Sequence, residues 1–251
     1  MGRLQDKTAL ITGGESGIGL ATARRFVVEG AQVHLVGLDE GRLKDAVQDI
    51  GPATSYTVAD VTDEAAVQAA VAAGTDRFGP LDVLFSNAGI SGAVADVLNY
   101  PSDEFSRTLA VHITGAFHMI KHSLPRMRDG GSIVITSSVV GLMGFGGLCG
   151  YVAAKHGQVG LMRAVATEVA PRRIRVNTLH PGPTSTAFQD EIEMTATGLP
   201  RDEAAAVFDD LLPLKRHATV DEIAAAVVYL GSDESAFVTR TTLSVDGGLA
   251  G

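Results

Sequence analysis

The sequence predicts an α/β fold: a single doubly wound domain on a parallel sheet of about seven strands, with helices on both faces. Two observations support this prediction. Short β-rich runs alternate with longer stretches of helical periodicity along all 251 residues, and parallel strands need such crossover connections. No composition shift, long linker or internal repeat divides the chain, so we expect one domain over residues 1–251.

Short runs rich in β-branched and aromatic residues predict the strands. Between them, apolar residues spaced as Leu43, Ala46 and Val47 place one stripe of a helix toward the sheet. Thr219, three residues before Glu222 and ahead of an apolar run, predicts a capping box at a helix start. The seven predicted strands are 8–12, 31–37, 56–60, 81–86, 132–137, 174–179 and 242–245.

The chain is acidic, with 20 Lys and Arg residues against 29 Asp and Glu residues and a net charge of -9. Phosphate backbones bind clustered cations, so we expect no nucleic-acid partner. The opening MGRLQDK lacks the apolar stretch of a secretory signal, and the one cysteine, Cys149, suits a reducing compartment. We therefore expect a cytoplasmic protein.

The uncharged run 131–154 is long enough to raise a membrane-spanning interpretation. Its glycines and its changing apolar pattern favour a strand followed by a loop, and we expect no membrane span.

The first predicted strand leads into a glycine-rich turn, Thr12-Gly-Gly-Glu-Ser-Gly-Ile-Gly19, and a helical pattern follows. Glycines permit a tight turn and close approach to a pyrophosphate, and the N-terminus of the helix offers unpaired N–H groups. An ordinary turn is the alternative. The pattern predicts a dinucleotide site whose contacts are Gly13, Ser16, Gly17, Ile18 and Gly19.

With this turn, and with Tyr151-Val-Ala-Ala-Lys155 preceded by Ser138, the sequence resembles the short-chain dehydrogenase/reductase family, whose fingerprints are Thr-Gly-x-x-x-Gly-x-Gly and Tyr-x-x-x-Lys. The resemblance covers essentially the whole chain. It implies a Rossmann-like fold, a homotetramer and an NAD(P)-dependent oxidoreductase that acts on CH–OH groups. It also implies that Lys155 and Tyr151 contact the cofactor, together with Asp60, Val61, Asn87, Ala88, Gly89, Pro181, Gly182, Thr184 and Thr186.

Physical chemistry supports the implied catalytic roles. Tyr151 and Lys155 lie four residues apart and share a helix face, so the ammonium is expected to lower the pKa of the phenol and make it a usable acid/base. Ser138 is expected to donate a hydrogen bond to the substrate oxygen as alkoxide character develops. The alternative is a Ser138 that caps a helix and a Tyr151 that packs within one.

The sequence departs from the family at a fourth catalytic position. The family carries Asn in an Asn-x-x-Gly-x-Phe pattern, where this chain has His112-Ile-Thr-Gly-Ala-Phe117. Imidazole can donate and accept hydrogen bonds, as an amide does, so His112 is a candidate to hold a water that leads to Lys155. Its ordinary pKa near 6.5 would then make that relay fail at acid pH. The alternative is that His112 only packs.

The predicted cofactor is NAD, with NADP less favoured. Gly37 stands where relatives that prefer NAD carry Asp, and Leu38 stands where those that prefer NADP carry a basic residue. Asp39 is a candidate to reach the ribose diol, although capping of the next helix explains it equally well. Glu15 would repel a 2′-phosphate, and neither Glu15 nor Ser16 is the basic residue that often binds one.

The segment 185–213 follows a predicted strand and interrupts the alternation, which predicts a substrate lid; a surface helical excursion is the alternative. His118 and His122 lie four residues apart, but without a third ligand of matching spacing they favour a partly exposed helix face over a metal site. Four apolar residues between Ser138 and Tyr151 predict an apolar substrate pocket: Leu142, Met143, Phe145 and Leu148.

The predicted reaction is hydride transfer between NAD(H) and a mostly apolar secondary alcohol or ketone. Two alternatives remain open. One is a 3-oxoacyl-thioester reductase that uses NADPH, and the other is a catalytically silent NAD-binding regulator. A homotetramer would be built partly from the helices around His112 and Tyr151, where small residues allow close approach: Ala153, Ala154, Gly157, Gly160 and Ala164.

Overall fold

A computed structural model describes residues 2–250 and contains one seven-stranded sheet in the order β3-β2-β1-β4-β5-β6-β7. Every paired strand is parallel to its neighbour. This arrangement confirms the predicted fold class. The strands are β1 Thr8–Thr12, β2 Gln32–Gly37, β3 Thr54–Val58, β4 Leu81–Ser86, β5 Met127–Thr136, β6 Arg175–Pro181 and β7 Thr242–Val245.

The strand boundaries agree with the predicted ones to within one residue except in β3, β5 and β6, of which β6 ends at Pro181, two residues after its predicted end. β3 ends at Val58, two residues before the predicted end, because its pairing with β2 already begins at Thr54. β5 starts at Met127, which pairs with Leu81 of β4 across a register shift. Residues 128–130 of β5 are exposed, and the predicted apolar run covers only the buried part of that strand.

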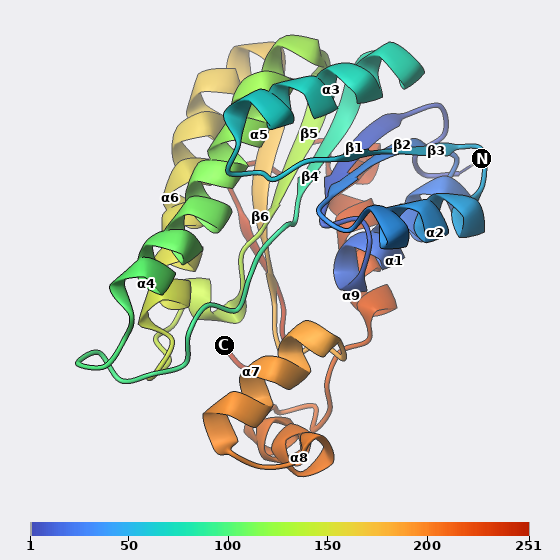
Figure 1. The fold of residues 1–251 in the computed structure, drawn as a ribbon. Helices are drawn as coiled ribbons and strands as arrows, with labels where there is room; N and C mark the ends of the chain where they lie inside the picture. Colours follow the sequence, from blue (N-terminus) through green and yellow to red (C-terminus); the bar gives the residue numbers. More distant parts are fainter. Residues whose placement is uncertain (1, 251) are drawn as a thin grey trace.

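Helices cover both faces of the sheet, as Figure 1 shows. One apolar cluster joins the sheet to α1, α2 and α9, and a second joins it to α3, α5 and α6. The capping box predicted at Thr219 starts α9. The helices are α1 Gly17–Val28, α2 Glu40–Ile50, α3 Glu64–Phe78, α4 Ser102–Leu109, α5 Gly115–Ser123, α6 Cys149–Val169, α7 Ala187–Thr197, α8 Arg201–Leu211 and α9 Val220–Gly231.

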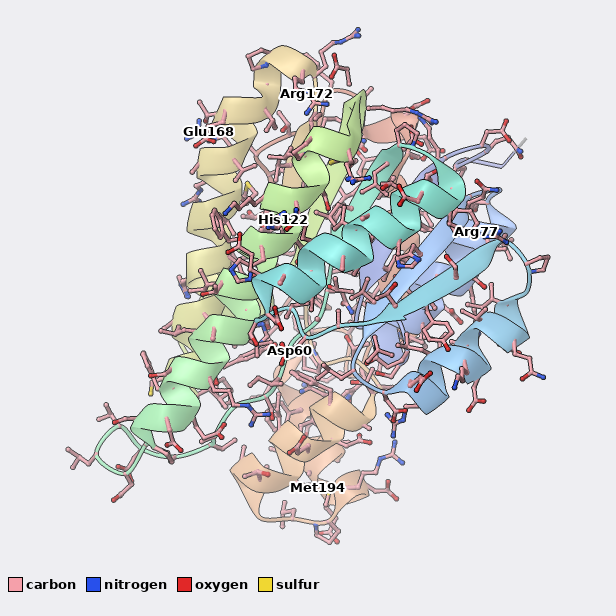
Figure 2. The ribbon with its side chains drawn as sticks, turned by 45° about the horizontal axis from the view of Figure 1, so that its top comes forward. Asp60, Arg77, His122, Glu168, Arg172 and Met194 are labelled. Atoms are coloured by element: carbon pink, nitrogen blue, oxygen red, sulfur yellow. The ribbon has the colours of Figure 1, made fainter. Side chains whose placement is uncertain are left out.

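The chain crosses from one side of β1 to the other between β3 and β4, which makes a topological switch point. Ligands of open α/β sheets bind outside the carboxyl ends of the strands at such a point. Helices α7 and α8 form a separate layer at that end of the molecule, below the sheet in Figure 1. Figure 2 places Met194 of α7 at the opposite end of the molecule from Glu168 and Arg172.

The run 131–154 is divided among the end of β5, a loop and the start of α6, as its pattern predicts. Among the described residues, no helix combines the length and the apolar character needed to cross a bilayer.

Candidate active site

A cavity of about 580 Å³ opens at the carboxyl ends of β1, β4, β5 and β6. It brings together all four expected catalytic residues and most of the expected cofactor contacts. Its lining includes Gly13, Ser16, Gly17, Ile18, Asn87, Ala88, Gly89, His112, Ser138, Tyr151, Lys155, Pro181, Gly182, Thr184 and Thr186.

The glycine turn provides the shape that a pyrophosphate group needs. Gly13 and Gly17 have positive φ angles of 63° and 48°, and a Cβ on Gly19 would lie 2.0 Å from the carbonyl oxygen of Gly13. Helix α1 begins at Gly17, and the side chain of its N-cap, Ser16, makes no capping hydrogen bond. The first-turn N–H groups therefore point into the cavity without a side-chain acceptor, so the turn fits a dinucleotide phosphate.

A hydrogen-bond network ties three strand ends to this turn. The Thr12 hydroxyl accepts hydrogen bonds from the backbone of Asn87 (2.8 Å) and Ala88 (2.9 Å). The Asn87 amide donates to the Thr12 carbonyl at 3.2 Å and accepts from the Thr136 hydroxyl at 3.0 Å. These bonds fix the ends of β1, β4 and β5 relative to one another, and the floor of the cavity is rigid as a result.

Ser138 leaves the end of β5 and Tyr151 stands on the first turn of α6, so both hydroxyls enter the cavity from different elements. The Ser138 hydroxyl also accepts a hydrogen bond from the backbone of Val140 at 3.3 Å. Tyr151 packs in an apolar cluster with Leu148 and Ile192, with Phe188 against it. The phenol is therefore shielded from water on its ring faces.

Lys155 lies one helical turn after Tyr151, and its Nζ is 5.2 Å from the centroid of the phenol ring. The amine donates a hydrogen bond to the carbonyl of Thr136 at 2.8 Å. The residue is only 2 % exposed, and this burial lowers the pKa of Lys155 to about 7. Burial disfavours the ammonium form, so neutral and charged forms coexist near neutral pH.

The structure corrects the expected effect of this lysine on Tyr151. Burial raises the pKa of Tyr151 above its ordinary value, and a hydrogen bond with Ser138 opposes the rise without cancelling it. The expectation of a lowered pKa is wrong for the polypeptide by itself, because desolvation of the phenolate outweighs the influence of a lysine that is itself partly neutral. Tyr151 is consequently a protonated phenol near neutral pH.

His112 is 1 % exposed and sits in a short π-helix, Ala110–Thr114, that joins α4 to α5. Its Nε2 lies 2.8 Å from the carbonyl oxygen of Ile90. Its ring meets that of Tyr151 edge to face, with centroids 5.3 Å apart. Nδ1 is buried and has no hydrogen-bond partner among the described residues. The backbone N–H of Ile90 also lies 3.2 Å from Nε2, but the carbonyl contact is the shorter one. A proton on Nε2, directed at that carbonyl, leaves Nδ1 as an acceptor beside the phenol.

Burial lowers the pKa of His112 well below its ordinary value, and the nearby charge of Lys155 lowers it further. The predicted protonation of His112 near pH 6.5 is therefore wrong. The backbone carbonyl of His112 accepts a hydrogen bond from the side-chain amide of Gln158 at 3.0 Å, so this carbonyl already has a donor.

Four expected cofactor contacts do not line the cavity: Gly19, Asp39, Asp60 and Val61. Asp39 caps α2, accepting a hydrogen bond from the backbone of Arg42 at 3.0 Å, which agrees with the alternative interpretation. Asp60 is exposed, stands two residues past the end of β3, and accepts hydrogen bonds from Thr62 (Figure 2). Val61 is buried in the core. Gly19 lies where it allows the glycine turn to close.

The segment 185–213 contains α7 and α8, and its first residues, 185–189, line the cavity. The Thr186 hydroxyl caps α7 by accepting from the backbone of Gln189 at 3.2 Å, and its methyl group lies against the glycine turn near Gly17. A histidine that no sequence motif singled out joins the two helices. His217 places Nε2 2.8 Å from a Glu193 oxygen on α7 and Nδ1 2.7 Å from an Asp209 oxygen on α8.

The cavity lining also contains residues that were not anticipated, among them Arg24, Arg42 and Phe188. Arg24 and Arg42 each pair with a carboxylate, Asp49 and Asp39 respectively. Periodicity alone places them on exposed helix faces, and only the packing of α1 beside α2 brings both to the mouth of the cavity. Phe188 stands two residues after Thr186, an expected cofactor contact, so the sequence does contain a signal for it.

His118 is buried and His122 is half-buried, so the predicted partly exposed helix face holds only in part. Both rings face Glu64 of α3, with His122 Nε2 3.0 Å and His118 Nε2 3.9 Å from its oxygens. Sequence spacing did not reveal this carboxylate, because α3 is remote along the chain. Within residues 2–250, no group of three or more His, Cys, Asp or Glu side chains is arranged to hold a metal ion.

Comparisons with known proteins agree with this geometry. A family model described as enoyl-(acyl carrier protein) reductase matches residues 13–250. Levodione reductase from Leifsonia aquatica is 41% identical over 98% of this chain and 95% of that relative. Trans-4-hydroxycyclohexanecarboxylate dehydrogenase from Sinomonas cyclohexanicum is 40% identical, over 98% of this chain and 93% of that protein.

Solved structures give the same result. A crystal structure of levodione reductase superposes with a TM-score of 0.94 at 39% identity and covers 98% of both chains. A blue fluorescent protein from a metagenomic library, solved in complex with NADPH, superposes with a TM-score of 0.90 at 31% identity, over 99% of this chain and 100% of that one. The fold and the whole extent of the chain are therefore shared with these proteins.

Proposed function

The chain belongs to the short-chain dehydrogenase/reductase family, and we propose that it moves a hydride between NAD(H) and a mostly apolar secondary alcohol or ketone. As a member of that family it is an oxidoreductase that acts on CH–OH groups. The observation that carries the proposal is the convergence of Ser138, Tyr151 and Lys155 on one cavity beside the glycine turn.

The substrate class we favour is a cyclic secondary alcohol or the matching ketone. The two relatives named above are a levodione reductase and a hydroxycyclohexanecarboxylate dehydrogenase. The apolar cluster around Tyr151 contains Leu148 and has Met143 and Phe145 against it, which supports the predicted apolar pocket, while Leu142 is 39% exposed and points away from the core. A six-membered ring offers the flat apolar surface that such a pocket removes from water.

The cavity residues divide the catalytic work. The nicotinamide, when bound, supplies or accepts the hydride. Ser138 donates a hydrogen bond to the substrate oxygen, and the protonated phenol of Tyr151 gives its proton to that oxygen during ketone reduction. Lys155 holds ribose hydroxyls of the cofactor, and Thr184 and Thr186 hold its carboxamide. These contacts orient the ring face toward the substrate carbon.

Lys155 and His112 complete the path for the proton. Tyr151 must be reprotonated after each reduction, and the amine of Lys155, with its pKa near 7, can pass on a proton at neutral pH. The free Nδ1 of His112 is an acceptor that can hold a water on the same side of the phenol. His112 then acts as a neutral positioning residue, where the family carries an amide.

The helices α7 and α8 act as a lid that closes over the substrate. We also favour a homotetramer. The exposed face of α6 carries Ala153, Gly160 and Ala164, and a Cβ on Gly160 would meet no atom within 4 Å, so a second helix can approach there. Gly157 instead accommodates Ile113 of the same chain.

The test is a spectrophotometric panel. Purified protein is mixed with NAD+ or NADP+ and cyclic secondary alcohols, and with NADH or NADPH and the matching ketones, while absorbance of the reduced cofactor is followed. Sustained turnover that favours NAD(H) by about tenfold in kcat/KM supports the proposal. A tenfold preference for NADPH with a 3-oxoacyl thioester as the best substrate supports the thioester reductase instead. Cofactor binding without turnover on any substrate indicates the silent regulator.

A further inference from the structure

The side chain of Glu15 leaves the glycine turn and lies over the carboxyl end of β2. Its Oε1 accepts a hydrogen bond from the backbone N–H of Leu38 at 3.1 Å. Its Oε2 is out of contact with solvent and has no hydrogen-bond partner among the described residues. A carboxylate oxygen that is buried without a donor is costly, so this atom is an acceptor that a ligand hydroxyl would satisfy.

Gly37 provides the space that this carboxylate occupies. A Cβ on Gly37 would lie 2.1 Å from Glu15 Oε2 and 2.4 Å from its Cδ. Gly37 does not have a positive φ angle, so the backbone conformation does not require glycine there. Glycine is required because a side chain would collide with the carboxylate of Glu15. The acidic group reaches the end of β2 from the glycine turn, and the last residue of the strand has no side chain to compete with it.

Asp39, the other acidic residue near this strand end, is already engaged. It caps α2 through the backbone N–H of Arg42 and pairs with the guanidinium of the same arginine, whose Nε lies 3.4 Å away. Both side chains are more than half exposed. Use of Asp39 by a ligand would therefore cost a helix cap and an ion pair, whereas use of Glu15 costs neither.

We propose that Glu15 recognises the ribose of the adenosine half of the dinucleotide, and that its Oε2 accepts a hydrogen bond from the 2′-hydroxyl. This inference rests on the proposed function, in which the cavity holds a nicotinamide dinucleotide. A charge-assisted bond to a hydroxyl is stronger than a neutral one. The same carboxylate would lie beside the dianion of a 2′-phosphate and repel it, so a single residue favours an unphosphorylated ribose and excludes a phosphorylated one.

Fragments that lack nicotinamide test this inference separately from hydride transfer. We would measure Kd for ADP-ribose and for 2′-phospho-ADP-ribose by titration calorimetry. Glu15→Gln keeps the shape and an oxygen acceptor for Leu38, and removes the charge. It is expected to weaken ADP-ribose binding about tenfold and to narrow the discrimination against the 2′-phosphate by at least as much.

Asp39→Asn is the matched control, because it removes one carboxylate charge from the same strand end. Its Kd for ADP-ribose is expected to stay within about threefold of the wild-type value. An unchanged Kd in Glu15→Gln, or a larger loss in Asp39→Asn than in Glu15→Gln, overturns the assignment. So does a wild-type protein that binds the 2′-phosphorylated fragment more tightly.

A transposed pair gives a second test that does not depend on one variant. Gly37→Asp alone brings a side chain into the position of the Glu15 carboxylate and is expected to weaken ADP-ribose binding. Glu15→Ala with Gly37→Asp moves the acid back onto the strand and is expected to bind at least tenfold more tightly than Glu15→Ala alone. Tighter binding by the single Gly37→Asp variant, or no recovery in the double variant, contradicts the inference. A protein that binds ADP-ribose in this Glu15-dependent way but shows no turnover refutes the proposed activity and leaves this assignment intact.

Discussion

The most unusual residue of the active site is Lys155, an amine that is almost completely buried beside a phenol. Its pKa is lowered from 10.5 to about 7 in the folded chain. Between those values the unfolded chain binds more protons than the folded one, so the free energy of unfolding rises with pH over this window. Burial of Lys155 therefore lowers the free energy of unfolding at pH 7 and below, and this loss becomes smaller as the pH rises above 7.

We predict that this loss of unfolding free energy can be measured by comparison with Lys155→Met, which removes the amine and keeps an unbranched side chain of similar length. The difference in unfolding free energy between Lys155→Met and wild type is expected to fall by about 1 kcal/mol per pH unit between pH 7.5 and 9.5. Urea denaturation at a series of pH values measures it, and taking the difference cancels the other titrating groups. A difference that stays constant with pH would mean that Lys155 keeps its charge in the folded protein.

His112 provides a second prediction at the level of one residue. His112→Asn preserves a donor and an acceptor toward Ile90, so we expect kcat to stay within about threefold of wild type. His112→Ala removes the bond to Ile90 and the edge-to-face contact with Tyr151, and kcat is expected to fall about tenfold or more.

The pH profile distinguishes positioning from titration. Because the pKa of His112 is far below its ordinary value, the acid limb of kcat is expected at the same pH in wild type and in His112→Asn. An acid limb that moves in His112→Asn would show that the histidine titrates during catalysis. Full activity in His112→Ala would show that it only fills space.

At the scale of elements, one histidine joins α7 to α8, the two helices of the proposed lid. Both ring nitrogens of His217 face carboxylates, one from α7 and one from α8, and both bonds are donated only by the imidazolium. Burial works against that charge, but the hydrogen bonds to Asp209 and Glu193 outweigh it and raise the pKa of His217. A raised folded pKa gives stability that is fully present below the unfolded value of 6.5 and is lost as pH rises through the folded value.

We therefore predict that the lid loosens on the alkaline side of neutrality. Hydrogen-exchange protection of α7 and α8, corrected for intrinsic rates, should fall between pH 6 and 8.5 in wild type and should be low at both values in His217→Gln. His156→Gln, which alters an exposed histidine of α6, is the control and should behave as wild type. Equal protection at both pH values in wild type would exclude the histidine as the fastening group.

Other elements show where sequence reasoning stops. Hydrophobic periodicity identified all seven strands. The inner strands of the sheet are largely buried and carry apolar runs, whereas the edge strands β3 and β7 are only partly buried, and the predicted bounds of β3 are two residues late. The π-helix that holds His112 left no such signal. The His112 ring packs against Gly89 of a distant segment, where a Cβ would lie 2.4 Å from the ring. The spacing of residues in the sequence does not show that these two segments are in contact.

For the molecule as a whole, the order of the strands determines where the candidate active site forms. The switch point between β1 and β4 gathers residues from the glycine turn, β4, β5, α6 and the lid into one cavity. Motif spacing anticipated Ser138, Tyr151 and Lys155, because each motif is local. The contact of Glu15 with the end of β2, the space that Gly37 leaves for it and the pairing of His217 were not anticipated, because each depends on a contact between separate elements. Capping of α2 by Asp39 was one of two interpretations that the sequence left open.

Transfer of deuterium tests the central claim most directly. The protein is incubated with a cyclic ketone and, in separate reactions, with NADH deuterated at the pro-R or at the pro-S position of C4 of the nicotinamide, and the alcohol is analysed by mass spectrometry. We predict one deuterium on the carbinol carbon of each product molecule with one of the two labelled cofactors and none with the other. We also predict that Tyr151→Phe, which loses the proton donor, forms less than about a tenth of that product in the same time and keeps its affinity for NADH within a few fold. Failure to label the product of any ketone, or equal labelling by wild type and Tyr151→Phe, would contradict this claim.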